Sequence, residues 1–199
     1  MSDFIDQTTL ALEEEGPVNA IAFTWLNRLR VKNKTVYNHS IQVANYAVSI
    51  GAKMGLPEEE ISVLKAAALL HDIGKLALPN ELLRRLPCVY KREVSLYKRH
   101  CDMGMNMLEN EPGFKDNICV FIRSHHERWD GKGFPRRLKG SNIPLSARII
   151  GVADYYDTVN PCSGNWPKTV KAAMREVFEQ SGTAFDPEVV KALAGALGH

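Results

Sequence analysis

The stretch PEEEISVLKAAALLHDIGK, residues 57–75, predicts a helix that carries a histidine and an aspartate into the protein interior. Pro57 suits the first turn of a helix, and the three glutamates that follow suit the positive end of the helix dipole. Apolar residues then recur at helical spacing as far as the pair His71-Asp72, and Gly74 breaks the pattern. Because imidazole is the commonest metal ligand, this pair at a helix end is a candidate metal-binding element.

Five of the six histidines fall in one ordered set together with two aspartates. His39 or His100 alone is more readily explained as a hydrogen-bonded core histidine. Five buried imidazoles, however, would each need separate polar partners, whereas one metal cluster accounts for all of them. The set therefore predicts a site for two metal ions with positions left open for water and substrate. Its members are His39, His71, Asp72, His100, His125, His126 and Asp154.

The donor types and their neighbours indicate the chemistry of this site. Imidazole and carboxylate without thiolate form a donor set typical of Fe, Mn, Zn or Ni. Asp72 is the candidate bridge, because His71 can hold one ion while the carboxylate spans both. Two ions joined in this way supply a nucleophile near neutral pH and offset charge on a phosphoryl transition state. Lys75 is a candidate for holding a phosphate oxygen, with a solvated lysine beyond the helix end as the alternative.

Composition and the terminal segments limit the class of protein. With 199 residues, 45% hydrophobic and 24% charged, the chain predicts one globular domain, and a net charge of +2 gives no reason to expect a nucleic-acid polymer as partner. We expect a tail or leading helix over residues 1–20 and the domain over 21–199. The first residues lack a signal-peptide pattern and no apolar run could span a membrane, so a cytoplasmic location is expected. Without C-x-x-C spacing, reduced thiols are expected at Cys88, Cys101, Cys119 and Cys162.

Helical periodicity recurs along the chain, and no segment shows the convincing alternation of a strand. Helices are expected over 35–54, 57–72, 91–110, 116–128, 145–159, 168–180 and from Pro187, after an Asp186 cap. One long loop, 129–144, is rich in glycine, proline and basic residues, and such loops are often functional. The sequence thus predicts an all-α bundle whose candidate ligands converge in the interior.

Four strings of the sequence closely resemble the HD-GYP family, a branch of the HD phosphohydrolase superfamily. They are HDIGKLALPNELL (71–83), RHCDMG (99–104), HHERWDGKGFP (125–135) and IPLSARIIGVADYYD (143–157). The similarity runs from about Val31 to the FDP motif at 185–187. The resemblance implies an HD-domain helical bundle with two or three metals, often iron, that hydrolyses cyclic di-GMP to pGpG or GMP. It also implies that the seven histidines and aspartates are the metal ligands and that Lys75 contacts the scissile phosphate.

Three departures from the family pattern limit what the resemblance implies. Phe134 replaces the tyrosine of the GYP motif, which removes a hydroxyl but keeps a ring that can stack or pack. Thr35 stands where trinuclear members carry a glutamate ligand, so a binuclear site is expected. The basic stretch after the last aspartate reads CSGNWPKT, residues 162–169, where Lys168 is the candidate nucleotide contact. Further candidates for phosphate contact, with solvated loop charges as the alternative, are Arg136 and Arg137.

These patterns lead to one expected function and two alternatives. The first is a metal-dependent phosphodiesterase in which a hydroxide bridging two divalent ions, iron first and manganese next, attacks phosphorus in cyclic di-GMP. The second is a catalytically weak module that binds the dinucleotide or a protein partner such as a diguanylate cyclase. The third is an HD phosphohydrolase for another cyclic dinucleotide or a nucleotide. No receiver or sensor domain is recognisable, so control by expression, a partner or an oligomer is expected, or the chain is a fragment.

Overall fold

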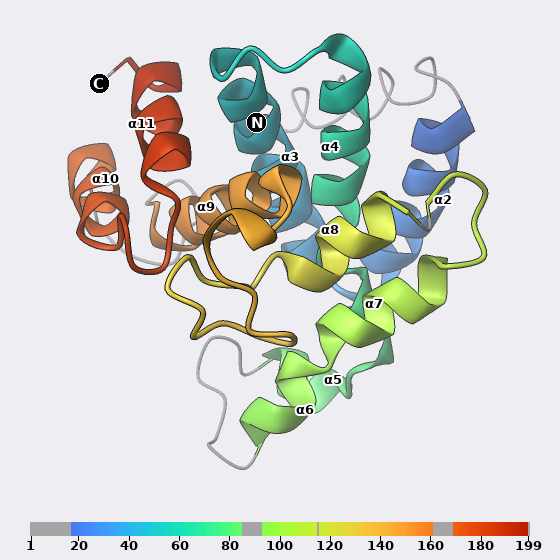
Figure 1. Ribbon diagram of the computed structural model, residues 1–199. Coiled ribbons are helices and arrows are strands. Elements are labelled where there is room, and N and C mark those ends of the chain that lie inside the picture. The colour runs from blue at the N-terminus through green and yellow to red at the C-terminus, as the bar shows by residue number, and fades with distance from the viewer. Residues whose placement is uncertain (1–16, 85–92, 115, 161–168, 199) are drawn as a thin grey trace.

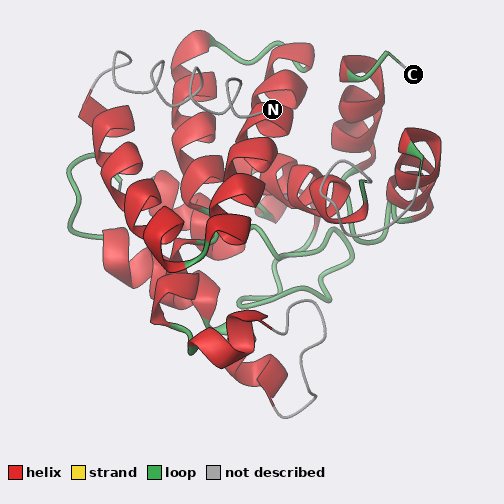
Figure 2. Ribbon diagram, turned by 180° about the vertical axis from the view of Figure 1, so that it is seen from behind, coloured by secondary structure: helices red, strands yellow, loops and turns green. Residues whose placement is uncertain are grey.

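A computed structural model describes residues 17–84, 93–114, 116–160 and 169–198, and these ranges are built of helices joined by loops (Figure 1, Figure 2). They contain no strand, and their β-type pairing is an isolated bridge between Ser181 and Phe185. The α-helices are α2 (Pro17–Lys32), α3 (Lys34–Lys53), α4 (Glu58–Leu70), α5 (Asn80–Arg84), α6 (Val94–Lys98), α7 (His100–Leu108), α8 (Ile118–Ser124), α9 (Leu145–Val159), α10 (Val170–Glu179) and α11 (Pro187–Ala196). The 3-10 helices η1 (Ile73–Ala77) and η3 (Gly140–Asn142) lie between them. The all-α fold expected from the sequence is confirmed.

Helix α3 is the central support of the core and packs against α2, α4, α9 and α11 (Figure 1). Its start is fixed by Asn33, whose side-chain oxygen accepts hydrogen bonds from the N–H groups of Thr35 and Val36 at 3.0 and 3.1 Å. Buried, mostly apolar residues then recur along the helix from Val36 to Gly51. His39 is therefore presented from a rigid, capped helix.

A tight corner is formed where η1 follows α4 and packs against α7, which in turn packs against α8. Gly74 makes this close approach possible. A Cβ atom at this position would lie 1.9 Å from the carbonyl oxygen of His100. Any side chain here would push η1 away from α7, and so the glycine that ends the predicted helix also sets the distance between two parts of the candidate site.

Several boundaries differ from those expected from the sequence. The described part of the helix predicted over 91–110 is two helices, because Arg99 N donates to the carbonyl three residues back and the chain turns there. Helix α8 ends at Ser124, earlier than predicted. Helix α2 extends to Lys32, beyond the tail or leading helix expected over residues 1–20, and Ala22, Leu26 and Leu29 form a buried stripe on it at helical spacing. The expected division into residues 1–20 and 21–199 stays a prediction, and α2 spans the proposed boundary.

The long loop after α8 is attached to the segment before α11. The N–H groups of Trp129 and Asp130 donate to the carbonyl oxygens of Ala184 and Thr183 at 3.0 and 2.8 Å. These bonds fix the start of the loop beside the end of α8, near the candidate ligands. Among the described helices, none is both long and apolar enough to cross a membrane.

Candidate metal centre

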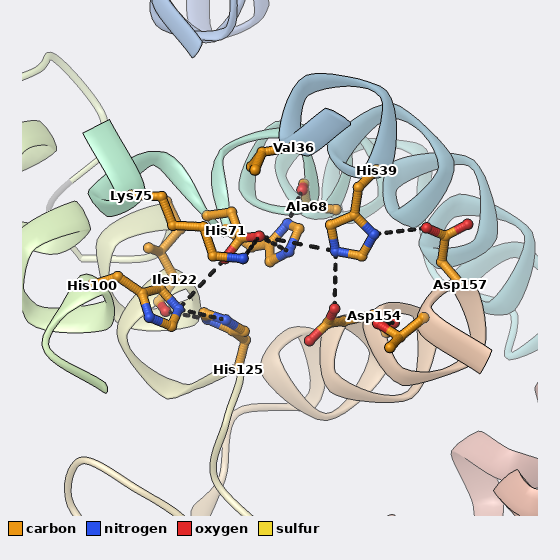
Figure 3. A network of polar contacts seen from close by, with 12 residues as sticks. Val36, His39, Ala68, His71, Lys75, His100, Ile122, His125, Asp154 and Asp157 are labelled. Atoms are coloured by element: carbon orange, nitrogen blue, oxygen red, sulfur yellow. Dashed lines mark hydrogen bonds and ion pairs between the residues drawn. The ribbon is translucent and has the colours of Figure 1, made fainter. Parts of the chain in front are cut away.

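The seven candidate ligands come from five parts of the chain and lie close together. Figure 3 labels five of them, His39, His71, His100, His125 and Asp154. Centroids of neighbouring imidazole rings are 4.0 to 5.4 Å apart. The ligands are presented by α3 (His39), the end of α4 (His71, Asp72), the start of α7 (His100), the end of α8 (His125, His126) and α9 (Asp154). The structure therefore brings together every residue of the predicted set.

One group of ligand atoms is formed by His39, His71 and Asp154, whose donor atoms all lie within 4.8 Å of one another. His39 Nε2 is 3.0 Å from Asp154 Oδ1. His71 is fully buried, and His39 and Asp154 are partly exposed. This group thus combines imidazole and carboxylate donors, and two of its three residues are partly exposed.

A second group is formed by His100, His125 and His126, and it also contains a thiol. His100 Nε2 lies 3.5 Å from His125 Nε2. Cys101 Sγ lies 3.6 Å from His100 Nε2, and its side chain is fully buried. Only a reduced thiol is expected at this position from the cysteine spacing, and the sequence signal for a closer role is the neighbouring His100. Cys101 and Cys119 are both free thiols.

Asp72 lies between the two groups and turns one carboxylate oxygen toward each. Its Oδ1 is 3.4 Å from His100 Nε2. Its Oδ2 is 3.4 Å from His71 Nε2 and 3.9 Å from His39 Nε2. This is the arrangement that a carboxylate bridging two metal ions requires.

Backbone carbonyl groups orient three of the imidazole rings. In each case the Nδ1–H donates to the carbonyl oxygen three residues earlier, and since a carbonyl only accepts, the proton is on Nδ1. The partners are Ala68 for His71, Tyr97 for His100 and Ile122 for His125, at 2.8, 2.7 and 2.6 Å. Each Nε2 therefore turns a lone pair toward the cluster, as metal-binding histidines do.

The fourth ring, that of His39, is oriented by a carboxylate outside the predicted set. His39 Nδ1 donates to Asp157 Oδ2 at 2.6 Å (Figure 3). Asp157 is buried and lies three residues after Asp154 on α9, and so both side chains share one face of that helix. That spacing is the sequence signal by which Asp157 could have been found.

The cluster contains buried nitrogen atoms that the described protein leaves without hydrogen bonds. They are Nε2 of His71 and Nε2 of His126. A buried polar atom without a partner is unfavourable by about 1–3 kcal/mol, so such atoms call for a bound species. Divalent transition metals take imidazole nitrogen and carboxylate oxygen as ligands. The residues present therefore fit bound divalent metal.

Burial and the carboxylates together set the charge of the histidines. Burial lowers the pKa of His100 to about 3 and the pKa of His125 well below its usual range, so both rings are neutral. Burial acts to lower the pKa of His39 as well, but hydrogen bonds to Asp154 and Asp157 outweigh it and raise that pKa to about 10. At neutral pH His39 is therefore protonated, and its Nε2 lies 3.0 Å from Asp154 Oδ1.

Lys75 is a buried partner of Asp72 and not a solvated lysine beyond the helix end. Its ammonium forms an ion pair with Asp72 Oδ2, and the residue is 6% exposed. Burial acts to lower the lysine pKa, but the nearby carboxylate outweighs it and the pKa is raised. Burial acts to raise the pKa of Asp72, but Lys75 and His71 outweigh it and hold that pKa well below its usual range. Both groups are therefore charged, and a cation stands at the edge of the cluster.

The expected substrate-side residues are divided between the rim of the cluster and the solvent. The ring of Phe134 lies against His126 with centroids 4.9 Å apart, and Lys98 Nζ is 4.9 Å from the Phe134 centroid. Arg136 and Arg137 are exposed to solvent. The remaining candidate, Lys168, lies outside the described residues.

A buried glutamate fixes the loop that carries Phe134. Glu127 is 8% exposed, and its two carboxylate oxygens accept from the N–H groups of Arg136 and Leu138 at 2.6 and 3.0 Å. Gly133 completes the turn, since a Cβ atom there would lie 2.3 Å from the backbone nitrogen of Arg128. Glu127 was not among the predicted site residues, although it follows the two histidines directly.

The sequence matches the family model described as HD domain over residues 25–189. It is 36% identical over 156 residues to the cyclic di-GMP phosphodiesterase response regulator RpfG of Xanthomonas campestris pv. campestris, covering 76% of this chain and 41% of that protein. It is 34% identical over 164 residues to a cyclic di-GMP phosphodiesterase of Thermotoga maritima, covering 81% and 44%. It is 30% identical over 175 residues to the 3'3'-cGAMP-specific phosphodiesterase 2 of Vibrio cholerae, covering 87% and 34%. The chain thus spans less than half the length of each of these relatives.

Two solved structures share the fold at low sequence identity. A cyclic GMP-AMP specific phosphodiesterase of Vibrio cholerae has a TM-score of 0.69 at 20% identity, covering 90% of this chain and 48% of that chain. Bd1817, an HDG"Y"P protein from Bdellovibrio bacteriovorus, has a TM-score of 0.67 at 20% identity, covering 81% and 52%. With the family model matched over most of its length, and in agreement with the HD-GYP resemblance of its motifs, this chain belongs to the HD domain family.

Proposed function

We propose that this domain hydrolyses cyclic di-GMP to pGpG, to GMP or to both, using two divalent metal ions. The observation that carries the proposal is the position of Asp72, whose two oxygens face two separate groups of histidines at 3.4 Å. When bound, a pair of ions supplies Lewis acidity and an activated water for attack on phosphorus. The relatives named cyclic di-GMP phosphodiesterases support this choice of substrate.

The residues of the chain have separate tasks in this proposal. The fixed Nε2 atoms of the histidines hold the ions without reorganisation, because their Nδ1 atoms are already bonded. The charged Lys75 offers an N–H donor to a phosphate oxygen and stabilises the negative charge that develops there. Phe134, at the rim, offers a ring face on which a guanine can stack.

Two observations support a binuclear centre with iron first and manganese second. Thr35, at the position of the third-metal ligand in trinuclear members, is exposed and lies in the capped first turn of α3. Two of the donor groups, one with His39 and one with His100, share no residue, and Asp72 lies between them. Nitrogen and oxygen donors of this kind suit iron and manganese.

Hydrolysis of a different cyclic dinucleotide, 3'3'-cGAMP, is the second candidate function. The 30% identical relative named as specific for 3'3'-cGAMP favours it.

The test combines metal analysis with a panel of substrates. Protein loaded anaerobically with Fe²⁺ or Mn²⁺ should bind two equivalents and convert cyclic di-GMP to a linear product faster than 3'3'-cGAMP or cyclic di-AMP. Asp72→Ala should lose turnover. Two bound equivalents without any linear product would reject the hydrolase and favour the binding module, which calorimetry with cyclic di-GMP would then measure. Faster cleavage of 3'3'-cGAMP would transfer the assignment to the second candidate, and three equivalents would contradict the binuclear centre.

A further inference from the structure

A buried thiol takes part in the second group of donor atoms. Cys101 Sγ, His100, His125 and His126 offer one donor atom each, and these atoms all lie within 4.8 Å of one another. Cys101 is fully buried, and His100 Nε2 lies within 3.6 Å of the sulfur. The sulfur therefore faces the cluster, where a thiol of purely structural role would face apolar packing.

The spacing of the donors matches the edges of a metal coordination polyhedron. A tetrahedral ion with bonds of about 2.1 Å to nitrogen and about 2.3 Å to sulfur places two nitrogens about 3.4 Å apart, and a nitrogen and a sulfur about 3.6 Å apart. The observed separation of His100 Nε2 and His125 Nε2 is 3.5 Å. The observed separation of His100 Nε2 and Cys101 Sγ is 3.6 Å. The two separations measured from His100 Nε2 thus match those expected around a single ion.

The position of Cys101 repeats a pattern seen twice elsewhere in the cluster. His71-Asp72 and His125-His126 are pairs of neighbouring residues at helix ends that both face the cluster. His100-Cys101 is a third such pair, at the start of α7. Because α7 packs against η1 on one side and α8 on the other, two neighbouring side chains at its start both reach the interior.

We propose that the Cys101 thiolate is a ligand of the metal ion held by His100, His125 and His126, and so the two metal positions differ chemically. The inference rests on the two-metal centre of the proposed function. The position of His39, His71 and Asp154 offers only nitrogen and oxygen, whereas the other position also offers sulfur. Thiolate is a soft ligand that favours iron, cobalt or zinc over manganese. The affinity of the position with Cys101 for Mn²⁺, relative to Fe²⁺, should therefore be lower than that of the position with His39, His71 and Asp154.

Cobalt reports directly on a sulfur ligand and needs no turnover. The full chain is loaded anaerobically with Co²⁺, bound cobalt is counted, and the near-ultraviolet band of thiolate-to-cobalt charge transfer is recorded. Cys101→Ser and Cys101→Ala are compared with the control Cys119→Ser, since Cys119 is a buried thiol on α8 whose sulfur contacts Met105 O at 3.8 Å. X-ray absorption of the cobalt-loaded natural chain gives a measurement that depends on no variant.

The expected result is a band in the natural chain and in Cys119→Ser that is absent from both Cys101 variants. These variants should also bind one of the two cobalt ions at least about tenfold more weakly. X-ray absorption should show a cobalt–sulfur distance of about 2.3 Å. Bound cobalt with no band and no sulfur scatterer would overturn the Cys101 assignment alone, as would a band that persists in Cys101→Ser. A natural chain that binds no cobalt would overturn the metal centre itself, and with it the proposed function.

Discussion

Replacing Asp157 by asparagine tests whether its hydrogen bond to His39 strengthens metal binding. Asp157 Oδ2 accepts a hydrogen bond of 2.6 Å from His39 Nδ1, and its side chain is 4% exposed. A carboxylate that bonds the far nitrogen of a metal-binding histidine typically contributes roughly 10–100-fold to metal affinity, or about 1.4–2.7 kcal/mol. We expect Asp157→Asn to weaken the binding of one of the two ions by about this factor. Only the group that contains His39 depends on Asp157.

The two dissociation constants are measured by competition with a chromophoric chelator. Asp102→Asn is the control, because this aspartate is 42% exposed and pairs with Arg123. Asp157→Ala should bind that ion more weakly than Asp157→Asn by a further ~1–3 kcal/mol, since it leaves His39 Nδ1 without an acceptor. Unchanged affinity in Asp157→Asn, or equal weakening of both ions, would refute the role given to this carboxylate.

Three further predictions concern the lysine, the loop and pH. Lys75→Met should lower kcat by about 10²–10³-fold with both ions still bound, and an unchanged turnover number with full metal content would contradict the phosphate contact. Glu127→Gln should lower the free energy of unfolding by about 1–3 kcal/mol in urea titrations and raise KM, because an amide NH₂ then faces a backbone N–H that the carboxylate had accepted. The Arg128 guanidinium lowers the pKa of Asp130 to about 2, so this pair is intact above pH 3.8 and is lost as the pH falls toward 2. In an NMR titration Arg128→Gln should return the Asp130 pKa toward 3.8, and an unmoved pKa would show that another group is responsible.

Most helices and the candidate ligand cluster could be predicted from short-range sequence patterns. The helix expected over 145–159 is observed as Leu145–Val159, and Asp186 caps α11 as expected, its side chain accepting from Glu188 N at 3.0 Å. The two adjacent ligand pairs ending α4 and α8 were visible because His-Asp and His-His neighbours are rare. The break at Arg99 was not visible, because α7 takes its direction from packing against η1 and α8, which lie elsewhere in the chain.

The residues that sequence reasoning missed act through contacts that bring distant segments together. His39 and Asp157 are 118 residues apart in the chain, and only the packing of α3 against α9 brings them to 2.6 Å. Cys101 was assessed by its spacing from other cysteines, whereas its relevant neighbours are the imidazoles of α7 and α8. A test for C-x-x-C spacing detects sites built from thiols and overlooks one thiol in a cluster of histidines.

The presence of Phe134 in place of the family's tyrosine affects the rim of the site and not the loop conformation that positions the ring. The ring contacts His126 and faces Lys98 Nζ, and neither contact uses a hydroxyl group. The loop is fixed by Glu127, which accepts hydrogen bonds from the backbone N–H groups of Arg136 and Leu138. These bonds do not depend on the side chain at position 134. What is lost is at most one hydrogen bond to a substrate, worth about 0.5–1.5 kcal/mol or roughly two- to tenfold in affinity. Under the proposed function, a difference of this size would alter the preference among cyclic dinucleotides and would leave the metal centre in place. The departure therefore bears on the proposed substrate more than on the proposed activity.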